Sequence, residues 1–64
     1  MTSFERRQRM DERNRLRRMN ECCLELALEE SEAGRHRRRI RLWRLSDRIE
    51  RRLADLAEEL GLRW

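Results

Sequence analysis

Residues 21–41 read ECCLELALEESEAGRHRRRIR and contain the change of charge that decides the fold. From Met19 to Gly34 every charged side chain is acidic, and from Arg35 to Leu45 every charged side chain is basic. Gly34 separates the two runs, and glycine commonly ends a helix because it adopts a left-handed conformation without a steric penalty. An acidic helix and a basic helix joined at such a residue attract each other when they fold back. The stretch therefore predicts an antiparallel pair of helices.

The first helix is expected over residues 3–32. Thr2 and Glu5 have the spacing of a capping box, in which Thr2 caps the helix and Glu5 occupies the third helical position. The chain has no Pro, and its two glycines, Gly34 and Gly61, stand just after the expected helix ends. With 47% charged residues, the composition favours long exposed helices over a compact mixed fold.

Apolar residues recur every three or four positions in both segments, as they do on the contact side of paired helices. The second helix is expected over residues 36–61, after a turn at 33–35. The expected seam consists of Leu16, Met19, Cys23 and Leu26 in the first helix and of Leu42, Ser46, Ile49, Leu53, Leu56 and Leu60 in the second. Ile40 and Trp43 lie off this seam and are expected to form a second contact face. The chain is thus expected to be all-α, with residues 1–64 forming one domain, a two-helix antiparallel hairpin.

Charge complementarity also predicts a register for the hairpin. Across a short turn the expected pairs are Glu21 with Arg48, Glu25 with Arg44, Glu30 with Arg39 and Glu32 with Arg37. An exposed ion pair contributes under about 1 kcal/mol, so such pairs select a register more than they stabilise the fold. The same register places Arg17 opposite Arg52, which leaves the basic half of the first helix partly uncompensated.

A chain of 64 residues is close to the lower size limit for independent folding. We therefore expect it to associate into a homodimer or larger oligomer, a four-helix bundle or a similar coiled-coil packing. The first helix also complements an antiparallel copy of itself, with a two-fold axis near Met19. In that homodimer Arg9 pairs with Glu29, Arg13 with Glu25 and Arg17 with Glu21. Both arrangements use Glu21 and Glu25, and the sequence does not rank them.

The pattern of an enzyme or a metal site is missing from the sequence. Its soft metal ligands are Cys22, Cys23 and His36, and their spacing matches no zinc site. With one His and no Gly-rich phosphate loop, we expect a non-catalytic protein without a metal or other cofactor. Two adjacent cysteines suit a reducing, cytoplasmic compartment. No apolar run approaches the roughly 18 residues that span a membrane.

The basic residues carry the functional signal. All seventeen are Arg, and the net charge is +4. Arg binds carboxylates and phosphates through two parallel hydrogen bonds. The nucleic-acid-binding candidates are Arg6, Arg9, Arg13 and Arg17 in the first helix and Arg37, Arg38 and Arg41 in the second. We therefore expect a small regulator that self-associates and binds an acidic partner, with a nucleic-acid backbone as the leading expectation and an acidic protein as another. The alternative is a protein-binding adaptor, inhibitor or complex subunit that uses the Leu seam and the Ile40 and Trp43 face.

Residues 12–21, ERNRLRRMNE, resemble the basic region and early first helix of basic helix-loop-helix transcription factors. In that family a Glu-Arg-x-Arg element reads the DNA major groove and an Asn follows further along. Glu12, Arg13, Arg15 and Asn20 match those positions here. The resemblance implies a DNA binder whose loop crosses back so that its two helices run parallel. A hairpin instead places the arginines of the first half of the first helix and those at the start of the second helix, Arg37, Arg38 and Arg41, at opposite ends. The direction of the helices therefore distinguishes the two hypotheses.

Overall fold

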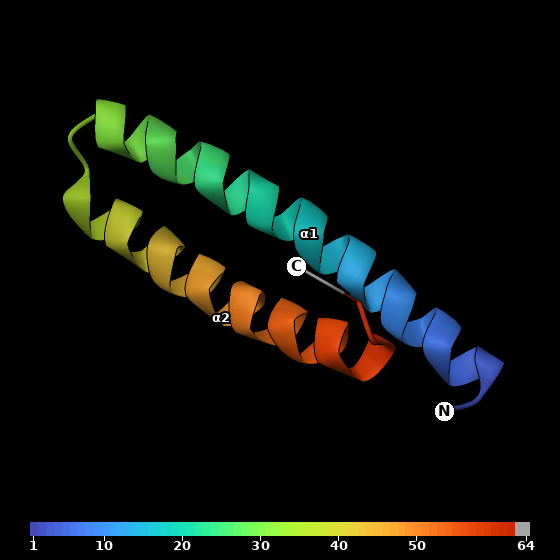
Figure 1. Ribbon diagram of the computed structural model, residues 1–64. Helices are drawn as coiled ribbons and strands as arrows, with labels where there is room; N and C mark the ends of the chain where they lie inside the picture. The colour runs from blue at the N-terminus through green and yellow to red at the C-terminus, as the bar shows by residue number, and fades with distance from the viewer. Residues whose placement is uncertain (63–64) are drawn as a thin grey trace.

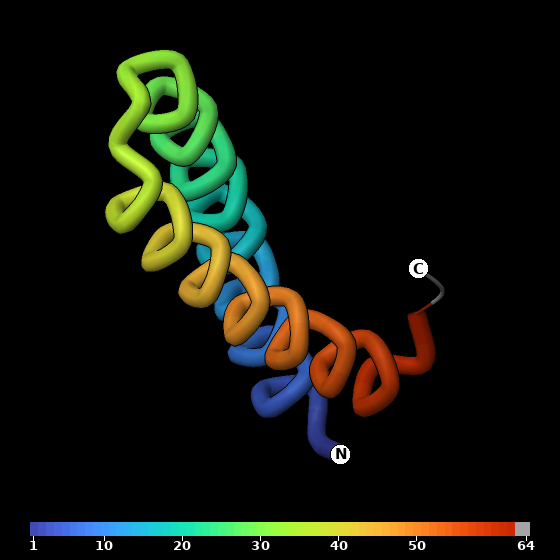
Figure 2. Tube along the Cα trace, turned by 90° about the vertical axis from the view of Figure 1, so that its left-hand side faces the viewer, coloured from blue at the N-terminus to red at the C-terminus, as the bar shows by residue number. Residues whose placement is uncertain are grey.

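The computed structural model describes residues 1–62, which form two helices, α1 (Ser3–Glu32) and α2 (His36–Leu60), joined by a short turn (Figure 1). The helices run antiparallel and side by side, and α1 extends past the end of α2 (Figure 1). Figure 2 shows from a second side that the helices are inclined to each other. The molecule measures 47 × 16 × 14 Å. The chain is an all-α helical hairpin, as the charge pattern predicts.

Both ends of α1 carry the capping residues expected from the sequence. The Thr2 Oγ1 accepts a hydrogen bond from the Glu5 backbone N–H at 3.1 Å. After the last turn Gly34 has a φ of +75°. This conformation lets the Arg35 N–H donate to the Glu30 carbonyl at 2.8 Å, the long-range bond of a Schellman motif. The turn is therefore built from local signals that the sequence shows directly.

The end of α2 repeats this arrangement. Gly61 has a φ of +67°, and the Leu62 N–H donates to the Ala57 carbonyl at 2.8 Å. The Gly61 N–H donates to the Glu58 carbonyl at 3.2 Å, so carbonyls that the helix leaves free are satisfied. The observed bounds of both helices lie within one residue of the expected ranges.

The core of the molecule is the seam between α1 and α2. The buried residues are Cys23 and Ala27 of α1 and Ser46, Ile49, Leu53, Leu56, Ala57 and Leu60 of α2. Leu56 is the most deeply buried large side chain, with 0% of its surface exposed. Leu16 packs against a cluster made by Cys23, Ile49 and Leu53. The buried side of α2 is thus the predicted one, and Leu42 continues it as a partly buried residue.

In α1 the seam differs from the prediction. Met19 and Leu26 were expected to lie in it, but they are 50% and 47% exposed. Asn20, which is partly buried, and Ala27, which is buried, take their places. The buried Ser46 hydroxyl donates a hydrogen bond to the Asn20 Oδ1. A buried hydroxyl needs such a partner, which a Met side chain does not offer, so this pair helps to set the rotation of α1 about its axis.

The ionic contacts correct the predicted register. Within residues 1–62 the ion pairs are Arg9–Glu59 at 2.9 Å, Glu12–Arg52 at 2.9 Å and Glu30–Arg35 at 3.4 Å. In this part of the chain none of the expected pairs forms, neither Glu21–Arg48, Glu25–Arg44, Glu30–Arg39 nor Glu32–Arg37. Arg52 lies opposite Glu12, whereas the prediction placed it opposite Arg17. Burial of a Leu or Ile side chain contributes about 1.5–3 kcal/mol and outweighs an exposed ion pair, so apolar packing sets the register.

The antiparallel helices also exclude a basic helix-loop-helix topology for this chain. That topology needs parallel helices, with the start of the second helix beside the basic region of the first. Here residues 37–39 follow the turn, while Arg13 and Arg15 lie in the half of α1 that is remote from the turn (Figure 1). The two Arg clusters are therefore at opposite ends of the hairpin.

Candidate nucleic-acid interface

Two arginines expected to bind nucleic acid, Arg6 and Arg9, instead bond to the C-terminal end of α2. Arg6 donates from Nη1 to the Leu60 carbonyl oxygen at 3.1 Å. The carbonyls at a helix C-terminus carry partial negative charge, which a guanidinium stabilises. Arg9 pairs with Glu59 at 2.9 Å, and Arg13 is partly buried. Arg6 and Arg9 therefore belong to the contact between the N-terminal half of α1 and the end of α2.

Arg9, Arg13 and Arg17 do not share one exposed face. Positions four apart are offset by about 40° because a helical turn takes 3.6 residues. Arg9 contacts α2, Arg13 is partly buried and Arg17 is exposed. The self-complementary series from Arg9 to Glu29 therefore winds around α1, and it does not present a single surface to a second copy.

The exposed arginines of α2 form a row along the helix. Five of them occur at alternating steps of four and three residues, namely Arg37, Arg41, Arg44, Arg48 and Arg51. This spacing keeps them on one side of the helix, where Arg44 and Arg51 each lie midway between two seam positions and so point away from α1. The row is about 21 Å long at a rise of 1.5 Å per residue. We call these five residues the Arg ridge.

The Arg ridge has no partner inside the hairpin. All five residues are exposed, and none makes an ion pair or a side-chain hydrogen bond to another residue between 1 and 62. Like charges three or four positions apart destabilise a helix by a few tenths of a kcal/mol per pair. Arg37 and Arg41 were candidates from the sequence, whereas Arg44, Arg48 and Arg51 were not. The signal that identifies all five is their alternating spacing.

Arg38, the remaining candidate of α2, is exposed but lies beside the ridge and not in it. It directly precedes Arg39, which is partly buried and turned toward α1. Arg17 of α1 is also exposed, on the other helix. The seven sequence candidates thus divide into Arg6 and Arg9 at the end of α2, the partly buried Arg13, a pair on the ridge and the two exposed positions Arg17 and Arg38.

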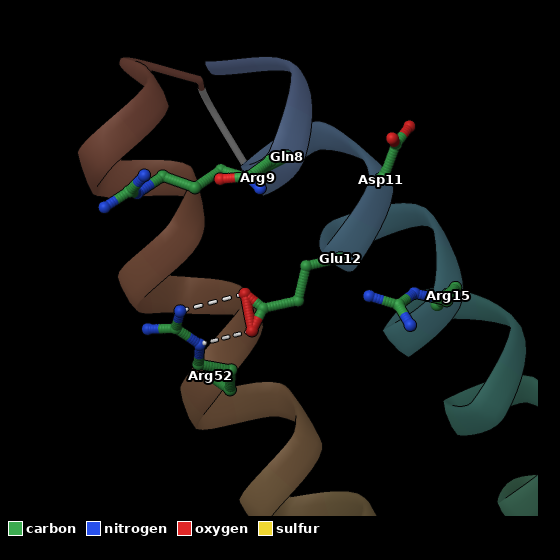
Figure 3. Close-up of a pocket in the computed structure, with 6 residues that line it drawn as sticks. All are labelled: Gln8, Arg9, Asp11, Glu12, Arg15 and Arg52. Atoms are coloured by element: carbon green, nitrogen blue, oxygen red, sulfur yellow. Dashed lines mark hydrogen bonds and ion pairs between the residues drawn. The ribbon is translucent and has the colours of Figure 1, made fainter. Parts of the chain in front are cut away.

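A shallow depression of about 400 Å³ lies between α1 and α2 at the end remote from the turn (Figure 3). Its lining residues are Gln8, Arg9, Asp11, Glu12, Arg15 and Arg52. Across it the Arg52 Nε and Nη2 donate to the two carboxylate oxygens of Glu12 at 3.2 and 2.9 Å (Figure 3). These bonds hold the pKa of the Glu12 carboxyl below its usual value. Glu12 and Arg52 thus pair with each other across the depression, which favours a structural ion pair over a ligand site.

A second exposed surface is apolar. The Arg39 Cζ lies 4.9 Å from the centre of the Trp43 ring. Arg39 also donates a hydrogen bond to the Ser31 Oγ at 3.4 Å. Trp43 of α2 and Ser31 of α1 therefore lie on the same side of the hairpin. Leu28 and Leu24 precede Ser31 by three and seven residues and share its side of α1. The exposed fractions are 46% for Leu24, 62% for Leu28, 41% for Ile40 and 51% for Trp43. We call these four residues the Trp43 face; it includes the expected pair Ile40 and Trp43.

The ligands considered for a metal do not converge. Residues 1–62 hold no group of three or more His, Cys, Asp or Glu placed to bind a metal ion. Cys22 is exposed and Cys23 is buried, both as free thiols, and His36 is exposed at the start of α2. Neither helix in the described part of the chain is long and apolar enough to cross a membrane.

Comparison of the chain with protein-family models, with curated proteins and with solved structures finds no match. Its function therefore has to be inferred from its own exposed surfaces. The Arg ridge is charged and the Trp43 face is apolar, so the two favour partners of different chemistry.

Proposed function

We propose that this protein is a small non-catalytic regulator that self-associates and binds a nucleic-acid backbone through the Arg ridge. The observation that carries the proposal is the ridge itself, five exposed arginines without partners in residues 1–62. A DNA duplex presents one phosphate charge per roughly 1.7 Å of its axis, so a row about 21 Å long can contact several phosphates at once. Each guanidinium can bind a phosphate with two parallel hydrogen bonds.

The composition of the ridge favours backbone contacts over base recognition. Reading of single-stranded bases depends on aromatic side chains on which the bases stack. The ridge residues are all Arg, and the ring of Trp43 lies under Arg39 on another side of α2. We therefore expect binding that is independent of sequence and strongly dependent on salt.

A salt-titrated mobility shift with generic duplex DNA tests the proposal. Phosphate contacts by all five ridge residues give a slope of about −4.5 for the logarithm of the binding constant against the logarithm of the salt concentration, and contacts by Arg37, Arg44 and Arg51 alone give about −2.7. Replacing Arg37, Arg44 and Arg51 together by Gln should reduce that slope by about three units, roughly one per lost contact. Absence of binding by the wild-type chain at about 50 mM salt would refute the proposal.

The matched control replaces Arg7, Arg17 and Arg18 of α1 by Gln. These arginines are exposed, and the substitution changes the net charge by the same amount. If the ridge is the binding surface, the control retains most of the salt slope. An equal loss in both variants would mean that net charge, and not the ridge, causes the binding.

The second candidate function is a protein-binding adaptor or inhibitor, and the Trp43 face is the observation that favours it. Its side chains are 41–62% exposed. Trp is enriched among the residues that dominate protein interfaces. Trp43→Ala should leave the salt slope for DNA unchanged. The adaptor is favoured if the wild-type chain binds neither DNA nor RNA and if Trp43→Ala abolishes its binding to a protein partner.

A further inference from the structure

The two sides of the hairpin differ in which exposed residues they carry. Consecutive helical residues turn by about 100°, so the residues before and after a buried position point to opposite sides. Leu26 precedes the buried Ala27, and Leu28 follows it. Because Leu28 belongs to the Trp43 face, Leu26 lies on the other side of the hairpin.

The Glu12–Arg52 pair marks this other side on both helices. Met19 lies seven residues after Glu12 in α1, and Leu45 lies seven residues before Arg52 in α2. Seven residues are close to two full turns, so each step stays on the side of the ion pair. The helices are antiparallel, so both steps lead toward the turn and bring Met19 and Leu45 to one level. One more step in α1 reaches Leu26.

This side is apolar at its centre. The exposed fraction is 50% for Met19, 47% for Leu26 and 39% for Leu45. Cys22, which lies between Met19 and Leu26 along the same side of α1, is also exposed. We call these four residues the Met19 face. An apolar centre with charged surroundings is the usual anatomy of a protein interface.

The charges around the Met19 face are divided between the helices. Near the turn, α1 is acidic from Met19 to Gly34 and α2 is basic from Arg35 to Leu45. Within residues 1–62 the ion pair that joins these two segments is Glu30–Arg35. Most of the opposite charges beside the turn therefore do not pair within one hairpin.

We propose that a second copy of this chain covers the Met19 face, related by a two-fold axis parallel to the helices. Each α1 then lies over the α2 of the other copy, so Met19 packs against Leu45. Glu29, the acidic residue after Met19 that shares this side of α1, comes close to the basic start of the other copy's α2, and the two-fold axis forms this contact twice. One long side of a hairpin of 47 × 16 × 14 Å offers roughly the 800 Å² per partner of a stable interface. The result is a four-helix bundle in which each helix is antiparallel to both neighbours. This inference specifies the surface for the self-association in the proposed function.

A two-fold axis perpendicular to the helices fits the same face less well. It would place α2 over the α2 of the other copy. Arg41, Arg48 and Arg52 each directly precede a seam position of α2, as Leu45 does, and so they lie toward this side. Like charges would then meet across the interface, which opposes association. The parallel axis leaves Arg37, Arg44 and Arg51 of the ridge pointing outward.

Molar mass by sedimentation equilibrium, without nucleic acid, tests the surface. The wild-type chain, of 8.0 kDa, should be a dimer at micromolar concentration. The double variant Met19→Ser/Leu45→Ser should be a monomer. The matched control Leu24→Ser/Leu28→Ser removes two exposed apolar side chains, 46% and 62% exposed, from the Trp43 face and should remain a dimer. A monomeric wild type, or dissociation of the control alone, overturns the proposal; circular dichroism identifies a variant that has unfolded.

Charge reversal tests the direction of the axis without removing apolar contacts. Glu29 lies within one turn of the level of Arg38, which faces Leu26 across the hairpin. Glu29→Arg and Arg38→Glu should each weaken the homodimer by about tenfold, because each introduces two like-charge contacts. Mixing the two variants should restore a dimer, since one contact regains opposite charges and the other keeps the wild-type pair.

Recovery on mixing separates contacts between chains from contacts within one chain, because an internal pair does not respond to a second variant. Failure to recover overturns the parallel axis. Neither measurement contains nucleic acid, so loss of backbone binding and loss of the dimer are distinguishable.

Discussion

Substitution of Leu56 by Ala tests whether the seam holds the hairpin together. Leu56 is 0% exposed, so its truncation removes contacts on every side. Leu→Ala at fully buried sites destabilises proteins by about 2–5 kcal/mol, with the lower values where neighbours close the cavity. A seam between two helices can close in part, so we expect a loss of about 2–3 kcal/mol. For a domain of this size, that corresponds to a fall in Tm of about 10–20 °C.

The free energy of unfolding is measured by urea titration with far-UV circular dichroism. Protein concentration is held constant, because association makes apparent stability depend on it. The control is Leu28→Ala, which deletes the same atoms from a side chain that is 62% exposed, and it should lose under about 0.5 kcal/mol. Equal losses at Leu28 and Leu56 would refute the assignment of the core to the buried stripe of α2.

Further predictions concern the turn, the ion pair and the polar contact in the seam. Gly34 has a φ of +75° and space for a Cβ, so Gly34→Ala should lower the free energy of unfolding by about 1 kcal/mol through backbone strain alone, and Gly34→Asn by less. Glu12→Gln should lower it by under about 1 kcal/mol at neutral pH. Because the pKa of Glu12 is lowered in the folded state, this difference should be fully present above the ordinary pKa of a Glu, about 4.3, and should be lost as the pH falls below it through the lowered folded-state pKa; urea titrations across pH would show this. Asn20→Ala should cost about 1–2 kcal/mol by leaving the buried Ser46 hydroxyl without its acceptor, and a double-mutant cycle with Ser46→Ala should show part of that loss recovered.

The features that the sequence predicts correctly are those with short-range causes. Thr2 and Gly34 act on backbone groups within a few residues, so their roles can be inferred without knowing the tertiary structure. The buried side of α2 is also clear, because its apolar residues, interrupted only by Ser46, form one stripe from Leu42 to Leu60. These signals are enough to predict two helices and the turn that makes them antiparallel.

The rotation of α1 could not be obtained in the same way. From Cys22 to Leu28 every residue except Glu25 is apolar, so apolar residues occur on both sides of the seam as well as in it. Choice among these sides depends on α2, where a buried Ser46 needs a hydrogen-bond partner and Asn20 provides it. A prediction that ranks residues by hydrophobicity selects Met19 and passes over Asn20 for this reason.

The candidate site shows a similar division. The sequence candidates included Arg37 and Arg41 but not Arg44, Arg48 and Arg51, which are related to them by helical geometry. The bonds of Arg6 and Arg9 to the end of α2 depend on the register, which weak exposed ion pairs do not determine. Which arginines stay free for a ligand is therefore a property of the folded hairpin.

The acidic and basic segments around Gly34 predict the hairpin, but few of their charges pair within the described part of it. The two segments contribute one ion pair, Glu30–Arg35, to the contacts of residues 1–62. Apolar packing of the seam leaves most of the other charged side chains of these segments exposed, whereas Arg39 is partly buried and turned toward α1. Charges left in this way still attract their opposites, and in the proposed dimer another copy of the same hairpin supplies them. The charge segregation around Gly34 is thus the basis of that dimer, in which Glu29 of each copy comes close to the basic start of the other copy's α2.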